Sequence, residues 1–258
     1  MKIVGAMQVG GYCEWILSRS LQNIASIVDE VVIVGSGRVS EQIVKIVGDC
    51  SKVVSEDLSP GNSIRIEWND MNRLLDLARG RNADWILFMD SDETFEPRLR
   101  MEIIEMVKNT DVGMYRFKKY WLWKDDVHYR VDRPEKFLTY GYNTYLVRAS
   151  NNLHFPNPAG PLWKRFSKHI IGREKLRPYF GRIPVTGVDG VIVDTDIVVL
   201  HHAALNWPQF VKNQIWYASL IAKREPKRSE YDIAEQLYSI LDESSLKLEP
   251  IPKDWVGW

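Results

Sequence analysis

The chain has 258 residues, of which 45% are hydrophobic and 26% charged, and this is enough apolar material for one large domain with a substantial core. Its 34 basic and 34 acidic side chains cancel, so no overall field favours nucleic acid or an anionic membrane as a partner. The two cysteines exclude a cysteine-based metal cluster, and no apolar run reaches the roughly 18–20 residues of a spanning helix, so we expect a cytoplasmic protein without a transmembrane segment.

The first half of the chain alternates strand and helix patterns. Strands are predicted at residues 2–9, 30–34, 52–54 and 85–89, and helices at 14–27, 41–47, 66–78 and 96–108. This order predicts an α/β fold: a mostly parallel, doubly wound sheet with helices on both faces. Ligands of such sheets bind at the carboxyl ends of the strands.

The pattern of residue types changes after Asp111, where aromatic and Pro/Gly-rich stretches separate the remaining elements. Strands are predicted at residues 114–123, 143–148 and 191–199, and helices at 207–223 and 231–241. We find no convincing linker between independent domains. The expected plan is one domain over residues 1–258, with a nucleotide-binding half at 1–110, an acceptor-binding half at 111–200, and C-terminal helices and a tail at 201–258.

The sharpest chemical signal is the acidic turn after the fourth predicted strand. The continuously apolar run Trp85–Met89 ends abruptly in Asp90, Ser91, Asp92 and Glu93. Carboxylates at this position suit Mn²⁺ or Mg²⁺, which take oxygen ligands and share the diphosphate oxygens of a nucleotide. The alternative interpretation is an acidic turn that caps the next helix.

At this point the sequence resembles the family 2-like glycosyltransferases of the GT-A fold, over about residues 2 to 105. The matching pieces are Glu14–Trp15, the run Val28–Gly37, Asn72–Leu75 with Ala78 and Gly80, Asp84–Trp85, and Asp90–Glu93. A later segment is similar to transferases that build lipopolysaccharide cores: Leu200–His202, Phe210, Lys212 and Tyr217.

The resemblance implies a glycosyltransferase that moves a sugar from a nucleotide-diphosphate donor, most simply a UDP- or GDP-sugar, to a hydroxyl of a glycan or lipid-linked acceptor, with inversion. It places the donor against Glu14, Gly35, Arg65, Asn72, Asp90, Ser91, Asp92 and Lys212. It places Mn²⁺ or Mg²⁺ on Asp90 and Asp92, completed by His201 or His202, and the sequence does not choose between the two histidines.

Three positions depart from the family pattern. Gly35 stands where relatives usually carry an aspartate, Met71 stands where an arginine is expected, and Glu14 alone remains of the usual Asn-Glu opening. Arg65 or Arg73 are the candidates to replace the missing arginine. Arg148 is a further candidate to contact the diphosphate.

Transfer with inversion needs a base that takes the proton of the acceptor hydroxyl, and a carboxylate is the usual choice. The candidates in the second half are Asp132, Glu135 and Asp189, each of which can equally be a surface acid. Two rival functions stay open. One is a nucleotidyltransferase, although the loop Gln8–Tyr12 lacks the cation that such enzymes carry; the other is a catalytically silent nucleotide- or sugar-binding relative.

Overall fold

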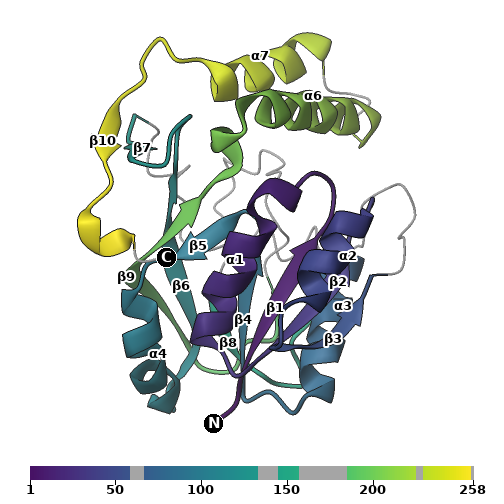
Figure 1. The fold of residues 1–258 in the computed structure, drawn as a ribbon, viewed down its shortest axis with the longest axis vertical. Coiled ribbons are helices and arrows are strands. Elements are labelled where there is room, and N and C mark those ends of the chain that lie inside the picture. Colours follow the sequence, from purple (N-terminus) through teal and green to yellow (C-terminus); the bar gives the residue numbers. More distant parts are fainter. Residues whose placement is uncertain (59–66, 133–144, 157–184, 225–228, 257–258) are drawn as a thin grey trace.

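Strands and helices alternate from Ile3 to Lys108, as the apolar periodicity predicts. The structure is a computed structural model that describes residues 1–58, 67–132, 145–156, 185–224 and 229–256 (Figure 1). The elements of this half are β1 (Ile3–Val9), α1 (Glu14–Ile27), β2 (Glu30–Gly35), α2 (Glu41–Gly48), β3 (Val53–Asp57), α3 (Glu67–Gly80), β4 (Trp85–Asp90), β5 (Glu93–Phe95) and α4 (Arg98–Lys108).

The second half adds long strands and a helical hairpin. Its elements are β6 (Val112–Trp121), β7 (His128–Arg130), β8 (Tyr145–Arg148), β9 (Val191–His201), the 3₁₀ turn η1 (Ala203–Leu205), α6 (Trp207–Arg224), α7 (Glu230–Leu241), β10 (Leu248–Pro250) and the 3₁₀ turn η2 (Lys253–Trp255). The short strands β5, β7 and β10 have too few residues for an alternating pattern, and the sequence did not predict them.

Eight strands form one sheet in the order β3-β2-β1-β4-β8-β6-β9-β5. The pairs β3–β2, β2–β1, β1–β4 and β6–β9 are parallel, whereas β8 runs antiparallel to β4 and β6, and β5 runs antiparallel to β9. The mostly parallel α/β sheet is therefore confirmed, with two reversed strands. Gln8 lies beside Asp90 and Val9 beside Gly35, so the carboxyl ends of β1, β2 and β4 meet at one edge.

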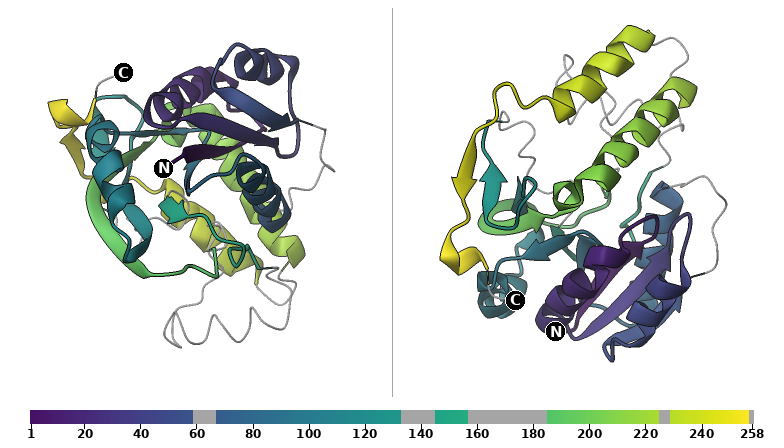
Figure 2. Two further views of the ribbon diagram at one scale, coloured as in Figure 1. Left: turned by 90° about the horizontal axis from the view of Figure 1, so that it is seen from below. Right: turned by 45° about the horizontal axis from the view of Figure 1, so that its top comes forward.

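Helices cover both faces of the sheet, and each face has its own apolar core. On one face the buried side chains of α1, α2 and α4 pack on the strands, with Leu17, Ile43 and Leu99 as examples. On the other face α3 packs through Met71 and Leu74. The end-on view in Figure 2 shows α1 and α3 on opposite sides of β1. This arrangement confirms the predicted layers.

The C-terminal segments return to the edge at which β1 and β4 end. The helices α6 and α7 lie side by side across that edge (Figure 1). After them β10 pairs antiparallel with β7, and the Trp255 ring stacks on Tyr120 with centroids 5.1 Å apart. The tail thus docks on its own domain. In the part of the chain that the structure describes, none of the helices has the length and apolarity needed to cross a membrane.

Candidate functional site

The acidic turn lies at the carboxyl edge, as predicted, and a buried ion pair supports it from within. Asp90 ends β4, and β5 begins three residues later at Glu93. The Glu93 side chain is fully buried, accepts a hydrogen bond from the Asp90 backbone N–H (3.1 Å), and forms an ion pair with Lys119 of β6. Asp90, Ser91 and Asp92 stay partly exposed. The third acid of the motif therefore fixes the turn, while the first two present their carboxylates at the edge.

His201 comes to this turn from the end of β9. Strand β9 pairs with β5 so that His201 lies opposite Glu93, and its Nε2 atom is 3.6 Å from Asp92 Oδ2. That distance is too long for a hydrogen bond. Adjacent ligands about 2.1 Å from an octahedral cation lie roughly 3 Å apart, so a small movement would let both atoms bind one ion. Among the described residues, His201 Nδ1 has no hydrogen-bond partner. Burial lowers the pKa of His201, and this keeps the imidazole neutral.

His202 faces a different neighbour. Its Nε2 atom lies 2.8 Å from the Thr94 hydroxyl, and its backbone N–H donates to the Asp92 carbonyl (2.8 Å). The residue is fully buried, and this burial, followed by the charges of His201 and Arg19, lowers its pKa to about 3. The structure therefore brings His201, rather than His202, to the Asp92 carboxylate. His202 therefore holds the backbone of the turn from its buried side.

Aromatic rings flank His201. Trp121, which lies beside His201 in the β6–β9 pairing, contacts the imidazole at a tilt with centroids 4.9 Å apart, and Phe210 of α6 meets the Trp121 ring edge-on. The ring contact limits the rotation of the imidazole and so favours the orientation that faces Asp92.

The loop from β1 to α1 closes the site on the α1 side. A Cβ at Gly10, whose φ is +152°, would lie 2.0 Å from the Ser36 carbonyl, so the loop can approach β2 only with glycine there. Cys13 is buried against Ser91, and this burial raises the pKa of its thiol. Glu14 accepts a hydrogen bond from the Ser40 hydroxyl, the N-cap of α2 (2.8 Å). Glu14 thus lies at the edge and joins α1 to α2.

The two departures at positions 35 and 71 have steric reasons. A Cβ at Gly35 would meet the Val39 side chain at 2.8 Å and the Leu58 backbone at 3.3 Å, so an aspartate does not fit without rearrangement. Met71 is fully buried in the core beneath α3. Arg73, two residues later, reaches the carboxyl edge instead and forms an ion pair with Asp57 at the end of β3.

Asp70 links the first three strands at this edge and was not predicted from the sequence. Its nearly buried carboxylate accepts hydrogen bonds from Gln8 Nε2 (3.0 Å), the Ser36 hydroxyl (2.7 Å) and Arg73 Nη1 (3.2 Å). Gln8 is a polar residue at the end of a predicted strand, as Asp90 is, whereas Asp57 lies three residues beyond the strand predicted at 52–54, which in the structure extends to Asp57. The position of Gln8 was the signal in the sequence that would have pointed to it.

Asn72 makes a pair of hydrogen bonds to the chain beyond β8. Its amide donates to the Phe155 carbonyl and accepts from the Phe155 N–H, both at 2.9 Å. These bonds fix residues 153–155 against α3, and contact of Asn72 with a donor stays a prediction. Lys212 is an exposed residue of α6, and Arg65 lies outside the described residues.

Two of the three candidates for the general base are poorly suited to that role, one because of its position and one because of its ion pair. Asp189 precedes β9, which starts beside Val112, so it lies at the edge where β4 and β6 begin, opposite to Asp90. The hydrogen bonds of Arg130, against the opposing effect of burial, lower the pKa of Asp132. Glu135 lies outside the described residues. Arg148 is likewise at the far edge, where its guanidinium donates to the Asn109, Thr110 and Val112 carbonyls.

Comparisons with known proteins identify the fold. The structure of S. aureus TarS 1–349 matches with a TM-score of 0.50 and 14% identity over 93% of this chain and 71% of that one. The chain has the GT-A type of fold. The same TarS fragment in complex with UDP matches this GT-A chain at a TM-score of 0.50 and 13% identity over 94% of this chain and 71% of that one. A longer TarS structure matches at 0.50 and 12% identity over 93% of this chain and 43% of that one.

Comparison with family models and with curated protein sequences finds no match. At this level of sequence identity the structural matches define only the fold of the chain. Its chemistry has to be inferred from the residues of the candidate site.

Proposed function

We propose that this protein is a metal-dependent glycosyltransferase that uses a nucleotide-diphosphate sugar. The observation that carries the proposal is the position of Asp92 in the turn after β4 and of His201 at the end of β9, which face each other at the carboxyl edge of a GT-A sheet. TarS, which shares the fold, is a glycosyltransferase of the family 2 type, and it has been solved in complex with UDP. UDP is therefore the first nucleotide to test.

The described residues contain no preformed group of three histidine, cysteine, aspartate or glutamate ligands, but the carboxylate and imidazole that meet at this edge are ligand types that suit a divalent cation such as Mn²⁺ or Mg²⁺. Asp92 and His201 would hold it, with Asp90 beside them, and the buried, neutral imidazole suits Mn²⁺. When bound, such an ion neutralises the charge that develops on the leaving diphosphate. The Glu93–Lys119 pair and His202 keep the turn rigid, so that the protein does not have to organise these ligands during the reaction.

In the proposed reaction the oxygen of an acceptor hydroxyl forms a bond to the anomeric carbon of the sugar. The bond from that carbon to the diphosphate breaks, and the diphosphate leaves with the electron pair. The hydroxyl proton passes to a carboxylate, for which Glu135 stays the candidate because Asp189 lies at the opposite edge and Asp132 is engaged in an ion pair with Arg130. Inversion at the anomeric carbon and a glycan or lipid-linked acceptor belong to the proposal through the sequence resemblance.

The experiment is thermal unfolding with UDP, GDP, CDP or ADP, each with and without Mn²⁺. A ligand that binds only the folded state raises the melting temperature by mass action. We expect UDP to raise it only when Mn²⁺ is present, and we expect Asp92→Asn to abolish that shift. Asp76→Asn, a change of the same kind at an exposed site on α3, is the matched control.

The outcome that overturns the proposal is the absence of a shift for every nucleotide at millimolar concentration. Release of UDP from a labelled UDP-sugar, measured on the same samples, separates an enzyme from a silent binder. Release of pyrophosphate from a nucleoside triphosphate would instead identify a nucleotidyltransferase.

A further inference from the structure

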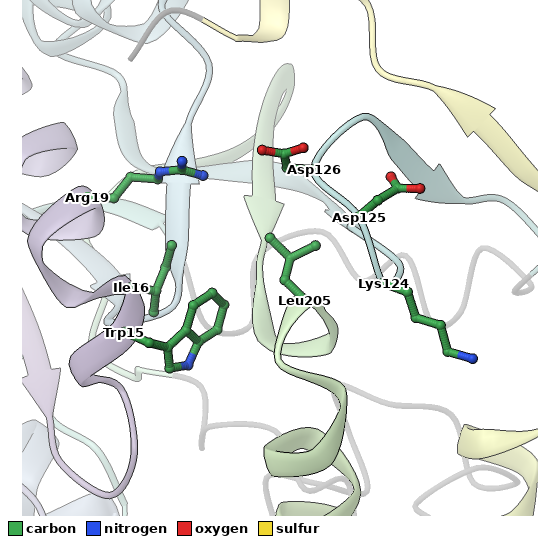
Figure 3. Close-up of a pocket in the computed structure, with 7 residues that line it drawn as sticks. All are labelled: Trp15, Ile16, Arg19, Lys124, Asp125, Asp126 and Leu205. Carbon is green, nitrogen blue, oxygen red and sulfur yellow. The ribbon is translucent and has the colours of Figure 1, made fainter.

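A polar cavity opens beside the candidate site, between α1 and the segment that joins β6 to β7. Figure 3 shows its lining: Trp15, Ile16 and Arg19 of α1, Lys124, Asp125 and Asp126 of the connecting segment, and Leu205 of η1. Its volume of about 360 Å³ lies at the lower end of the range for small-molecule sites. The cavity is large enough for one or two sugar rings.

The cavity is adjoined on two sides by residues that hold the acidic turn. Cys13, two residues before Trp15, is packed against Ser91. Leu205 donates its backbone N–H to the carbonyl of His202, which itself bonds to Asp92 (2.9 and 2.8 Å). The backbone of Leu205 thus connects the cavity to the acidic turn, and the lining does not include the residues around Asp70.

Trp15 gives the cavity an aromatic surface. Its side chain is 41% exposed, whereas its neighbours Ile16 and Leu17 are buried. The close-up shows the Trp15 ring at the cavity, next to Ile16 and across from Leu205 (Figure 3). An exposed indole lacks the stabilisation that a tryptophan in the core obtains from burial of its apolar surface. On a concave, polar surface it offers a flat face for the C–H groups of a sugar ring and an N–H for a hydroxyl.

Two charged residues of the cavity, Lys124 and Asp125, are held by other parts of the protein. Asp125 accepts the backbone N–H groups of Val127 and His128, and Lys124 is paired with Glu243 over the Trp207 ring. Within the part of the chain that the structure describes, the Asp126 carboxylate has no hydrogen-bond or ion-pair partner. Arg19 and Asp126 stand on opposite sides of the cavity (Figure 3).

The balance of charge selects the kind of ligand. Two basic and two acidic side chains line the cavity, so there is no net field to hold a phosphate or a second nucleotide. A hydroxyl both donates and accepts hydrogen bonds, so a ligand rich in hydroxyls can donate to the Asp126 carboxylate and accept from one of the five N–H donors of Arg19. An aromatic face between a donor and an acceptor fits a neutral saccharide.

We propose that this cavity is a saccharide subsite, which binds the part of the acceptor that is remote from the reacting hydroxyl. The role as an acceptor subsite rests on the proposed function, whereas the binding of a saccharide does not. Trp15 is the stacking surface, and Arg19 and Asp126 orient the sugar through its hydroxyls.

The test uses the full chain labelled with ¹⁵N and follows the indole N–H resonance of Trp15, which is identified by its loss in Trp15→Phe. The probes are methyl β-glucoside, methyl β-N-acetylglucosaminide and maltose, with inorganic phosphate as the charged comparison. At least one saccharide is expected to shift this resonance at millimolar concentration. The resonance of Trp216 on α6, which is also 41% exposed, should not move.

Variants define what overturns the proposal. Asp126→Asn should weaken the saccharide affinity read from the Trp15 resonance about tenfold, as expected for the loss of one hydrogen-bond contact. Trp15→Ala has no indole to follow, so its affinity is measured by saturation-transfer NMR of the saccharide, and it should also fall about tenfold relative to the parent chain. Trp216→Ala should have no effect. Absence of any saccharide-induced shift at Trp15, or a shift with phosphate alone, would refute the subsite. The metal-dependent UDP shift should survive in Trp15→Ala, so failure of this proposal is distinguishable from failure of the proposed function.

Discussion

His201 Nε2 lies 3.6 Å from Asp92 Oδ2, although the two residues belong to distant parts of the chain. The pair forms because β5 follows the acidic turn immediately and then runs antiparallel to β9, which places Glu93 opposite His201. The pairing of the short strand β5 with β9 therefore brings His201 close to Asp92.

The two histidines should have separable effects. His201→Asn removes the imidazole that faces Asp92, and we expect the Mn²⁺ concentration needed for the UDP-dependent thermal shift to rise at least tenfold. His202→Asn breaks the buried contact to Thr94 and should lower the free energy of unfolding by about 1–3 kcal/mol, with little change in the Mn²⁺ requirement. Mn²⁺ titrations and urea unfolding of both variants measure this. The reverse pattern would assign the cation to His202.

Asn72→Asp should reduce stability because a carboxylate would replace the amide that donates to the Phe155 carbonyl. The bond from the Phe155 N–H can remain, so we expect a loss of about 1–3 kcal/mol in the free energy of unfolding. Asn69→Asp, at an exposed position of the same helix, is the control in urea unfolding. If donor KM rises in parallel, Asn72 contacts the donor as the resemblance implies; an unchanged stability would contradict the clamp.

Asp70→Asn keeps the shape of the side chain and removes its charge. Gln8 and Ser36 both donate to Oδ2, which the amide oxygen can replace, but the variant loses the ion pair between Oδ1 and Arg73 and presents an NH₂ group there, so we expect about 2 kcal/mol less stability. Since Gln8 and Ser36 lie at the same edge as the acidic turn, the affinity for UDP should also fall. Urea unfolding and the UDP thermal shift report the two effects. Equal stability of Asp70→Asn and the exposed control Asp76→Asn would show that the network does not stabilise the edge.

The stability that Glu30 contributes should depend on pH. Hydrogen bonds from Arg81 and Lys2 lower the pKa of Glu30 from 4.5 to about 2. A carboxyl whose pKa is lower in the folded state stabilises the protein above pH 4.5 and loses that contribution as the pH falls toward 2. The urea midpoint of Glu30→Gln should therefore lie below that of the parent chain at pH 6 and approach it at pH 3.

A double-mutant cycle isolates the ion pair from other acid-sensitive groups. Arg81→Met should lower the urea midpoint at pH 6, and adding it to Glu30→Gln should have less effect than in the parent chain. Midpoint differences that stay constant from pH 6 to pH 3 would contradict the assignment.

The sequence alone determined the position of the acidic turn and the elements of the first half other than β5. The helix from Glu14 to Ile27 and the strand that begins at Trp85 have the predicted limits within a residue, because their apolar spacing reflects burial of a helix stripe and of a whole strand. The turn could be placed because an apolar strand that stops at acidic residues must stop at the surface.

Only the tertiary structure decided which residues meet there. A buried strand has the same apolar pattern whichever way it runs, so the reversed β5 and β8, the choice of His201 over His202, and the removal of Asp189 to the opposite edge were not predictable. The lack of room at Gly35 and the hydrogen bonds of Asp70 likewise arise from contacts between separate elements. Periodicity reports how deeply an element is buried, whereas strand direction and register decide its neighbours.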